Sequence, residues 1–233
     1  MTVSGVVSRQ ALPRPIVSRV CASSEPGLLN QIRDNGWDMA VWNREMPREI
    51  SEAAQVFAAG PARLLMDVRV NPEPAVCISV EEALADCQPL ELRVWLGRDI
   101  QELAERFARA LDCETVRIRL HRVVDKGCAA FHVDTLSARL LCTYAGAGME
   151  WVDEPDVRRN ELGLNGRSLS DANRAIVPDT SRIRELKAGA VGIFKGRLWG
   201  DGSARGLVHR SPPGCCEKHA RLRLLIDPGH SQY

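Results

Sequence analysis

The chain has 233 residues, enough for one well-buried core, and its 45% hydrophobic and 26% charged residues are typical of a folded globular protein. A formal net charge of +1 excludes an overall polyelectrolyte attraction to nucleic acid, so we do not expect nucleic acid as a partner. No apolar run approaches the roughly 20 residues of a membrane helix and no secretory signal is evident, so we expect a cytoplasmic protein with no membrane partner.

Residues 1–25 combine Pro13 and Pro15 with several Ser and Arg, and are predicted to form a loose N-terminal arm. Residues 26–112 predict a mixed layer of helices and strands. The apolar periodicity indicates strands over 38–42 and 64–70, a helix over 50–59 that ends at Gly60, a short helix opened by a Ser79–Glu82 capping box, and a longer helix from Asp99 to Cys113.

From residue 113 to residue 233, nearly every predicted element is a short strand between turn residues. Strands are predicted over 116–121, 139–144, 149–152, 189–197, 207–210 and 221–227. Residues 153–180 are polar and irregular, which is typical of a lid or substrate loop. The pattern predicts an α+β fold with a C-terminal double-stranded β-helix (jelly roll). We expect the N-terminal helices and strands to pack on one of its sheets, so that the chain forms one compact unit.

Two histidines and one carboxylate give the strongest functional signal. His132 and Asp134 are two residues apart, so on an extended strand both side chains point to the same side and reach one metal ion. His209 follows a Gly-rich loop far downstream, and a rolled antiparallel sheet returns the chain to complete such a site. This donor set matches the facial triad that holds catalytic iron(II) and leaves other positions open. The sequence therefore predicts a metal centre formed by these three residues.

Eight cysteines lie along the chain without a C-x-x-C pair, at positions 21, 77, 87, 113, 128, 142, 215 and 216. This spacing excludes a zinc ribbon and favours reduced thiols over a disulfide framework. Cys128 lies shortly before His132, where its thiolate would select a softer ion such as zinc, but we favour a small buried hydrophobe. Cys215 and Cys216 are either an incidental surface pair or a redox-active one, and we favour the first.

Five stretches of the C-terminal half resemble one bacterial family, that of domain of unknown function 1826. They are Cys128–Asp134 (CAAFHVD), Arg139–Tyr144 (RLLCTY), Gly148–Trp151 (GMEW), His209–Pro213 (HRSPP) and Arg223–Asp227 (RLLID). Members are often encoded near zinc-homeostasis genes, so the resemblance implies a role under metal limitation.

The order of the triad and a following arginine is also remotely similar to iron(II)- and 2-oxoglutarate-dependent dioxygenases. That resemblance implies a cation for the far carboxylate of 2-oxoglutarate, and a guanidinium grips a carboxylate through two parallel hydrogen bonds. Arg221 and Arg223 share one face of the last predicted strand, and alternation does not choose between them. Tyr144 is a further candidate that would hydrogen-bond the co-substrate from the barrel wall.

We therefore expect an iron(II)-dependent oxygenase that uses 2-oxoglutarate and dioxygen on a small-molecule or side-chain substrate. The alternative is a zinc-binding accessory protein of metal homeostasis without turnover, in which Cys128 joins triad residues in a closed site. A jelly roll that binds a small ligand without a metal is a third interpretation. Neither the substrate nor the oligomeric state follows from the sequence.

Overall fold

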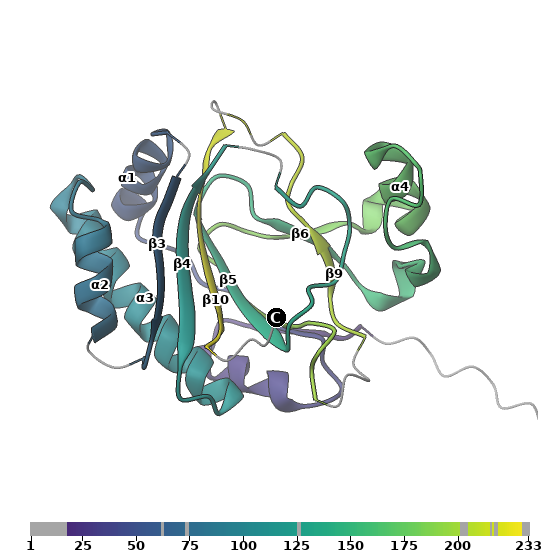
Figure 1. Cartoon of the computed structure of the whole chain (residues 1–233), viewed down its shortest axis with the longest axis horizontal. Coiled ribbons are helices and arrows are strands. Elements are labelled where there is room, and N and C mark those ends of the chain that lie inside the picture. The colour runs from purple at the N-terminus through teal and green to yellow at the C-terminus, as the bar shows by residue number, and fades with distance from the viewer. Residues whose placement is uncertain are drawn as a thin grey trace, which may run out of the picture.

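Two β-sheets form the centre of the computed structural model, which describes residues 18–61, 63–72, 75–124, 127–200, 205–214, 216 and 219–229 (Figure 1). The larger sheet has seven strands, in the order β1 (Val20–Ser23), β2 (Met39–Trp42), β8 (Val191–Lys195), β5 (Ala138–Ala145), β10 (Arg221–Pro228), β4 (Val116–Val123) and β3 (Arg63–Val70). Its strands pair antiparallel, except that β1 and β2 are parallel. The smaller sheet is antiparallel, in the order β7 (Arg184–Leu186), β6 (Met149–Val152) and β9 (Val208–Arg210).

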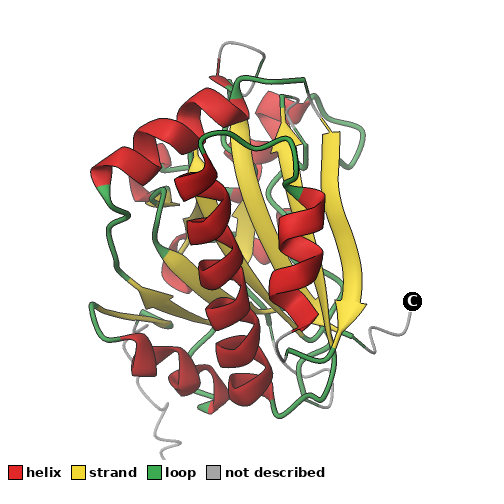
Figure 2. Ribbon diagram, turned by 90° about the vertical axis from the view of Figure 1, so that its left-hand side faces the viewer, coloured by secondary structure: helices red, strands yellow, loops and turns green. Residues whose placement is uncertain are grey.

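Three helices cover the outer face of the larger sheet, namely α1 (Arg48–Ala58), α2 (Ala75–Ala83) and α3 (Leu90–Leu111) (Figures 1 and 2). Strand alternation explains this packing. On β10, Leu222, Leu224 and Ile226 belong to the same buried cluster as Leu96 and Leu103 of α3. Because successive side chains of a strand point to opposite faces, the intervening residues of β10 face the smaller sheet.

The inner face of the larger sheet packs against the smaller sheet (Figure 1). Apolar residues of both sheets fill the space between them, including Leu141, Phe194 and Leu225 from the larger sheet and Met149 and Trp151 from the smaller one. Beyond the smaller sheet lies α4 (Leu169–Ile176) (Figure 1). Between β6 and β7 the chain also forms three 3-10 helices, η2 (Glu154–Asp156), η3 (Arg159–Glu161) and η4 (Thr180–Arg182). Another 3-10 helix, η1 (Pro26–Arg33), precedes β2. In the part of the chain described here, no helix combines the length and apolar character needed to cross a membrane.

The structure confirms most elements predicted from apolar periodicity. The predicted helix over 50–59 corresponds to α1, and the predicted strands correspond to β2, β3, β4, β5, β6, β8, β9 and β10. The N-terminal helices lie on one face of the sheet, as expected. The N-terminal strands differ from the prediction, because β1, β2 and β3 are members of that sheet instead of packing on it.

The start of the long helix was predicted wrongly. It begins at Leu90, directly after Pro89, and Asp99 lies inside it instead of capping it. Proline is well suited to the beginning of a helix, and Leu92 and Leu96 continue the helical spacing toward it. Asp99 is buried because its carboxylate pairs with the distant Arg44, a partner that local sequence does not reveal.

Three smaller corrections concern helix and loop boundaries. The helix α2 begins at Ala75, so Ser79 lies in its interior and does not open it. The end of the predicted N-terminal arm forms β1, whose pairing with β2 orders residues 20–23, whereas residues 1–17 lie outside the described part. The predicted irregular loop at 153–180 contains α4, whose N-cap Ser168 accepts a hydrogen bond from the backbone of Asp171.

Candidate metal centre

A short antiparallel contact brings the two distant histidines together. The backbone N–H of His132 donates to the carbonyl of His209, and the N–H of His209 donates back to the carbonyl of His132, each at 3.0 Å. Their rings lie with centroids 4.5 Å apart. The expectation that the fold returns the chain beside the His-x-Asp pair is therefore confirmed.

Asp134 completes a cluster with these histidines. Its Oδ1 atom lies 3.4 Å from Nε2 of His132, and its Oδ2 atom lies 3.6 Å from Nε2 of His209. One potential ligand atom from each residue lies within 4.8 Å of the other two. Neighbouring ligands of one ion, each about 2.1 Å from it, are roughly 3 Å apart, so small adjustments bring all three atoms onto a metal.

Backbone contacts orient both imidazole rings for metal binding. Nδ1 of His132 lies 2.8 Å from the carbonyl of Ala130, and Nδ1 of His209 lies 3.1 Å from the carbonyl of Leu207. A carbonyl oxygen only accepts, so each Nδ1 carries the proton and donates it. In the neutral ring this leaves the lone pair on Nε2, the atom that faces Asp134.

Burial and charge set the protonation of the cluster. Burial lowers the pKa of His209 to about 4, against the opposing charge of Asp134. Burial alone would raise the pKa of Asp134, but its hydrogen bond with His132 and the positive charge of Arg139 hold that pKa well below its usual value. Burial also lowers the pKa of His132, but hydrogen bonds with Asp134 and Ala130 outweigh it and raise that pKa. At neutral pH His209 is therefore neutral and Asp134 ionised, and a metal ion would displace the proton that Nε2 of His132 shares with Asp134.

A buried network of ion pairs holds the carboxylate of Asp134. Arg139 on β5 donates from Nη1 to Oδ2 of Asp134 at 2.7 Å, and from Nε and Nη2 to the carboxylate of Asp227 at 2.6 and 2.9 Å. Arg119 on β4 pairs with Asp227 as well. The carboxylate of Asp134 is thus fixed by a guanidinium that is itself held by strand β10.

The three residues open onto a cavity of about 180 Å³ between the sheets, which we call the metal-site cavity. It is lined by Arg119, Cys128, His132, Asp134, Arg139, Leu141, Met149, His209, Arg210, Ser211, Arg221, Arg223 and Leu225. Both arginines predicted as co-substrate anchors therefore lie at the same cavity as the triad. Arg221 is only 1% exposed, so this face of β10 is buried between the sheets.

The structure separates the other predicted site residues from the triad. Tyr144 points to the helix side of β5, where its hydroxyl donates to Asp99 at 2.8 Å and its ring packs edge-on against Trp95. It does not line the metal-site cavity. Cys128 lines that cavity but is exposed, so the expectation of a small buried hydrophobe is wrong, and it is not part of the cluster of ligand atoms found among the described residues. Cys215 lies outside the described residues, and Cys216 is exposed.

The charged residues around the triad, Arg119, Arg139 and Asp227, are not predicted from the sequence. The sequence predicts only an ordinary strand at Arg139, although a single arginine in an apolar strand whose alternate residues face inward is a usable signal. Asp227 ends the last predicted strand on the same face as Arg221 and Arg223. Its pairing with Arg139 depends on strand order, which local periodicity does not give.

Comparison with known proteins identifies a family. A family model described as "Protein of unknown function (DUF1826)" matches residues 23–227. No curated protein matches the chain.

Several solved structures are similar to this one. A putative oxygenase from Shewanella oneidensis is 12% identical, covers 90% of this chain and 88% of its own, and has a TM-score of 0.46. The dioxygenase for auxin oxidation 1 from Arabidopsis thaliana, solved with 2-oxoglutarate, is 12% identical with coverages of 91% and 92% and a TM-score of 0.43. A prolyl-4-hydroxylase from Pseudomonas putida is 12% identical with coverages of 87% and 96% and a TM-score of 0.40.

Proposed function

We propose that this chain, which belongs to the DUF1826 family of proteins of unknown function, is an iron(II)-dependent oxygenase that uses 2-oxoglutarate and dioxygen. We also propose that its two sheets are those of a double-stranded β-helix. The observation that supports the proposal is the meeting of His132, Asp134 and His209 at one end of a cavity lined by arginines.

The donor set fits iron(II). His132 and His209 would bind through Nε2 and Asp134 through a carboxylate oxygen, which leaves positions for a chelating co-substrate and dioxygen. When bound, iron(II) would supply the dioxygen activation that no side chain of the chain provides. Arg139 is a positioning residue, because it touches Asp134 and holds that carboxylate toward the histidines.

Strand order favours Arg223 over Arg221 as the anchor for 2-oxoglutarate. Along the inner face of β10, Asp227 is linked to Asp134 through Arg139, and Leu225, Arg223 and Arg221 follow in that order away from the triad. Residues two apart on a strand are separated by roughly 6 to 7 Å, about the length of a five-carbon diacid. Arg223 lies two such steps from Asp227 and Arg221 lies three, so Arg223 is the nearer of the two to a co-substrate whose other end is at the metal.

The neighbours of Arg223 suit a carboxylate. Thr143 on β5 and His121 on β4 lie opposite Arg223 in the sheet. Thr143 is fully buried, and within the described structure its hydroxyl oxygen has no hydrogen-bond partner. Burial, followed by the positive charges of Arg223 and Arg119, lowers the pKa of His121 to about 4. The region around Arg223 therefore has a positive potential, which suits the far carboxylate of 2-oxoglutarate.

Anaerobic titration tests the proposal. Adding iron(II) and 2-oxoglutarate to the full chain is expected to give a visible charge-transfer band, which His209→Ala should abolish. Arg223→Gln should retain iron binding but weaken 2-oxoglutarate binding roughly 10- to 100-fold, because one charge-assisted bidentate contact is lost. Arg48→Gln, at an exposed position on α1, is the matched control and should behave as wild type.

Two results would contradict the proposal. One is the absence of both the band and any binding of 2-oxoglutarate in the presence of iron(II). The other is stoichiometric zinc after purification without chelator, lost on Cys128→Ala, which would support the zinc-binding accessory protein instead.

A further inference from the structure

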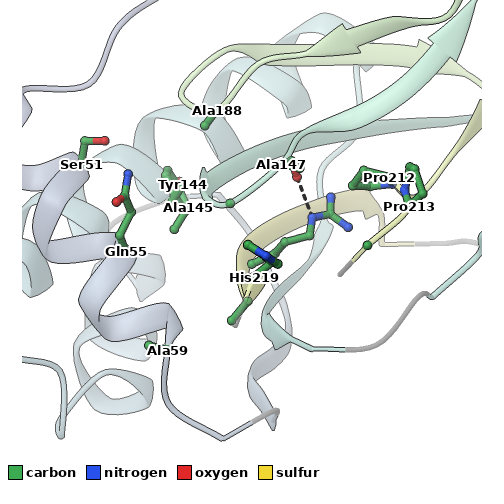
Figure 3. A pocket seen from close by; sticks show the side chains of 14 residues that line it. Ser51, Gln55, Ala59, Tyr144, Ala145, Ala147, Ala188, Pro212, Pro213 and His219 are labelled. Atoms are coloured by element: carbon green, nitrogen blue, oxygen red, sulfur yellow. Dashed lines mark hydrogen bonds between the residues drawn. The ribbon is translucent and has the colours of Figure 1, made fainter. Parts of the chain in front are cut away.

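A second and larger cavity, of about 560 Å³, lies beside the metal-site cavity (Figure 3). Its walls come from α1, from the β5–β6 turn, from residues 212–214 and from residues 219–221. Figure 3 shows Ser51 and Gln55 of α1 on one side of it and Pro212 and Pro213 on the other. Its volume is in the range of pockets that bind small molecules. We call it the α1 cavity.

Arg221 lines both cavities. Its Nε donates to the carbonyl of Ala147 at 2.7 Å, the hydrogen bond drawn in Figure 3, and this contact fixes the guanidinium against the β5–β6 turn. Gly146 makes the close approach possible: its φ is +80°, and a Cβ there would lie 2.9 Å from Cγ of Arg221 and 2.5 Å from the carbonyl oxygen of Ala220. The turn is therefore shaped around this side chain.

The chemistry of the α1 cavity suits an anion. Among the described residues that line it, none is Asp or Glu, whereas Arg221, Ser51, Gln55 and His219 all carry hydrogen-bond donors. The positive charge of Arg221 lies at the wall of this cavity, so a ligand that carries a negative charge is favoured there electrostatically.

Apart from Tyr144, the remaining wall residues are small and largely apolar, namely Ala59, Ala145, Gly146, Ala147, Ala188, Pro212, Pro213, Gly214 and Ala220. They leave room for a hydrocarbon skeleton beside the guanidinium, which inorganic anions do not have. The planar guanidinium also matches the geometry of a carboxylate.

The geometry points to the α1 cavity as a second ligand site, which binds a small organic carboxylate through Arg221. This site goes beyond the proposed oxygenase function and does not depend on it, because neither the metal nor 2-oxoglutarate takes part. Along β10 it lies beyond Arg223 as seen from the triad, so its ligand is a molecule distinct from the co-substrate held at Arg223.

Methyl NMR of the metal-free full chain tests this site. Alanine methyl groups at positions 59, 145, 147, 188 and 220 report on the α1 cavity, and the methyl group of Met149 reports on the metal-site cavity. Benzoate and succinate are the probes, with benzamide as the uncharged comparison and inorganic phosphate as the anion without a carbon skeleton. We expect saturable shifts of the alanine methyl groups with at least one carboxylate, and none with benzamide.

Three variants locate the binding. Arg221→Gln should weaken carboxylate binding at least about tenfold, because a charge-assisted contact is lost. Gln55→Glu should weaken it about fivefold by adding a negative charge to the wall at an exposed helix position, where folding is not at risk. Arg223→Gln, which alters a residue that lines the metal-site cavity alone, should change the affinity less than about twofold.

The site would be overturned by any of three results. The first is no saturable shift of the alanine methyl groups up to about 10 mM of either carboxylate. The second is binding that shifts Met149 alone and is lost in Arg223→Gln, which would place the ligand in the metal-site cavity. The third is equal affinity for phosphate, which would make the site a general anion site without preference for an organic carboxylate.

Discussion

Strand β5 carries a buried network of arginine and aspartate on each of its two faces. On the helix side, Arg44 pairs with both carboxylate oxygens of Asp99, and Tyr144 donates a further hydrogen bond to Oδ2 of that carboxylate. On the inner side, Arg139 connects Asp134 to Asp227. The same pair of residue types is thus buried on either side of one strand.

The two networks differ in what the carboxylate faces. Asp99 is enclosed by its donors and by the aromatic rings of Trp42 and Trp95 around Arg44. Burial raises the pKa of the neighbouring Cys142 to about 12, as expected of a closed interior. Asp134 instead receives one hydrogen bond from Arg139 and points its oxygens toward two imidazoles at the wall of a cavity. A closed network, in which donors enclose the carboxylate, stabilises the core. An open network, in which the carboxylate faces a cavity, can bind a ligand.

Breaking the closed network should have the largest effect. Asp99→Ala leaves the Arg44 guanidinium buried without its carboxylate, which is expected to cost about 3 to 5 kcal/mol of unfolding free energy. Tyr144→Phe removes one hydrogen bond to the same carboxylate and should cost about 1.5 to 3 kcal/mol. Chemical denaturation of the metal-free protein measures both, and metal affinity should stay within about twofold of wild type. If Asp99→Ala lowers the unfolding free energy by less than about 1 kcal/mol, this network does not stabilise the core.

Breaking the open network around Asp134 should lower metal affinity strongly and the unfolding free energy only a little, the reverse of the result expected for Asp99. Asp134→Asn removes a negatively charged ligand atom and should lower iron(II) affinity at least about 100-fold in a competition titration. Because Arg139 retains Asp227, the unfolding free energy of the metal-free variant should fall by less than half as much as in Asp99→Ala. Unchanged metal affinity would remove Asp134 from the ligand set.

The positioning role of Arg139 predicts an intermediate effect. Arg139→Gln frees the carboxylate of Asp134 to rotate and should lower iron(II) affinity roughly tenfold without abolishing binding. Arg117→Gln is the matched control, because Arg117 pairs with Asp67 on β3 instead of with the triad. Equal affinities for the two variants would argue that Arg139 acts only through general stability.

The last prediction concerns pH. The pKa of His121 is about 4 in the folded chain, below the 6.5 of an ordinary histidine, so the unfolded chain takes up a proton first as the pH falls. The stability associated with this neutral side chain is fully present above pH 6.5 and is lost as the pH falls toward 4. His121→Gln should therefore flatten the decline of unfolding free energy over this range. If the unfolding free energies of the variant and wild type decline equally over this pH range, the lowered pKa of His121 is contradicted.

The strands and site residues that can be predicted from the sequence are those that depend on the order of neighbouring residues in the chain. Alternation located β4, β5 and β10, and the two-residue spacing of His132 and Asp134 correctly predicted that these two side chains lie together, which the structure places beside His209. Both predictions follow from the fact that residues two apart on a strand point to the same face.

The remaining features depend on partners far away in the chain. Asp99 resembled a helix cap because its ion pair with Arg44 is invisible locally, and Arg139 was overlooked because Asp227 reaches it only through strand order. Tyr144 was assigned to the wrong side of its strand, since alternation gives two faces without saying which of them meets the helices. Charged residues in a core are thus the ones that local sequence describes least well.

Anomalous diffraction at the iron edge, from crystals of the full chain loaded anaerobically with iron(II), tests the metal centre most directly. The proposed centre predicts one strong anomalous peak that lies about 2.1 Å from each of three atoms, namely Nε2 of His132, Nε2 of His209 and a carboxylate oxygen of Asp134. A peak coordinated by other residues, or iron-loaded crystals without a peak at these three side chains, would contradict it.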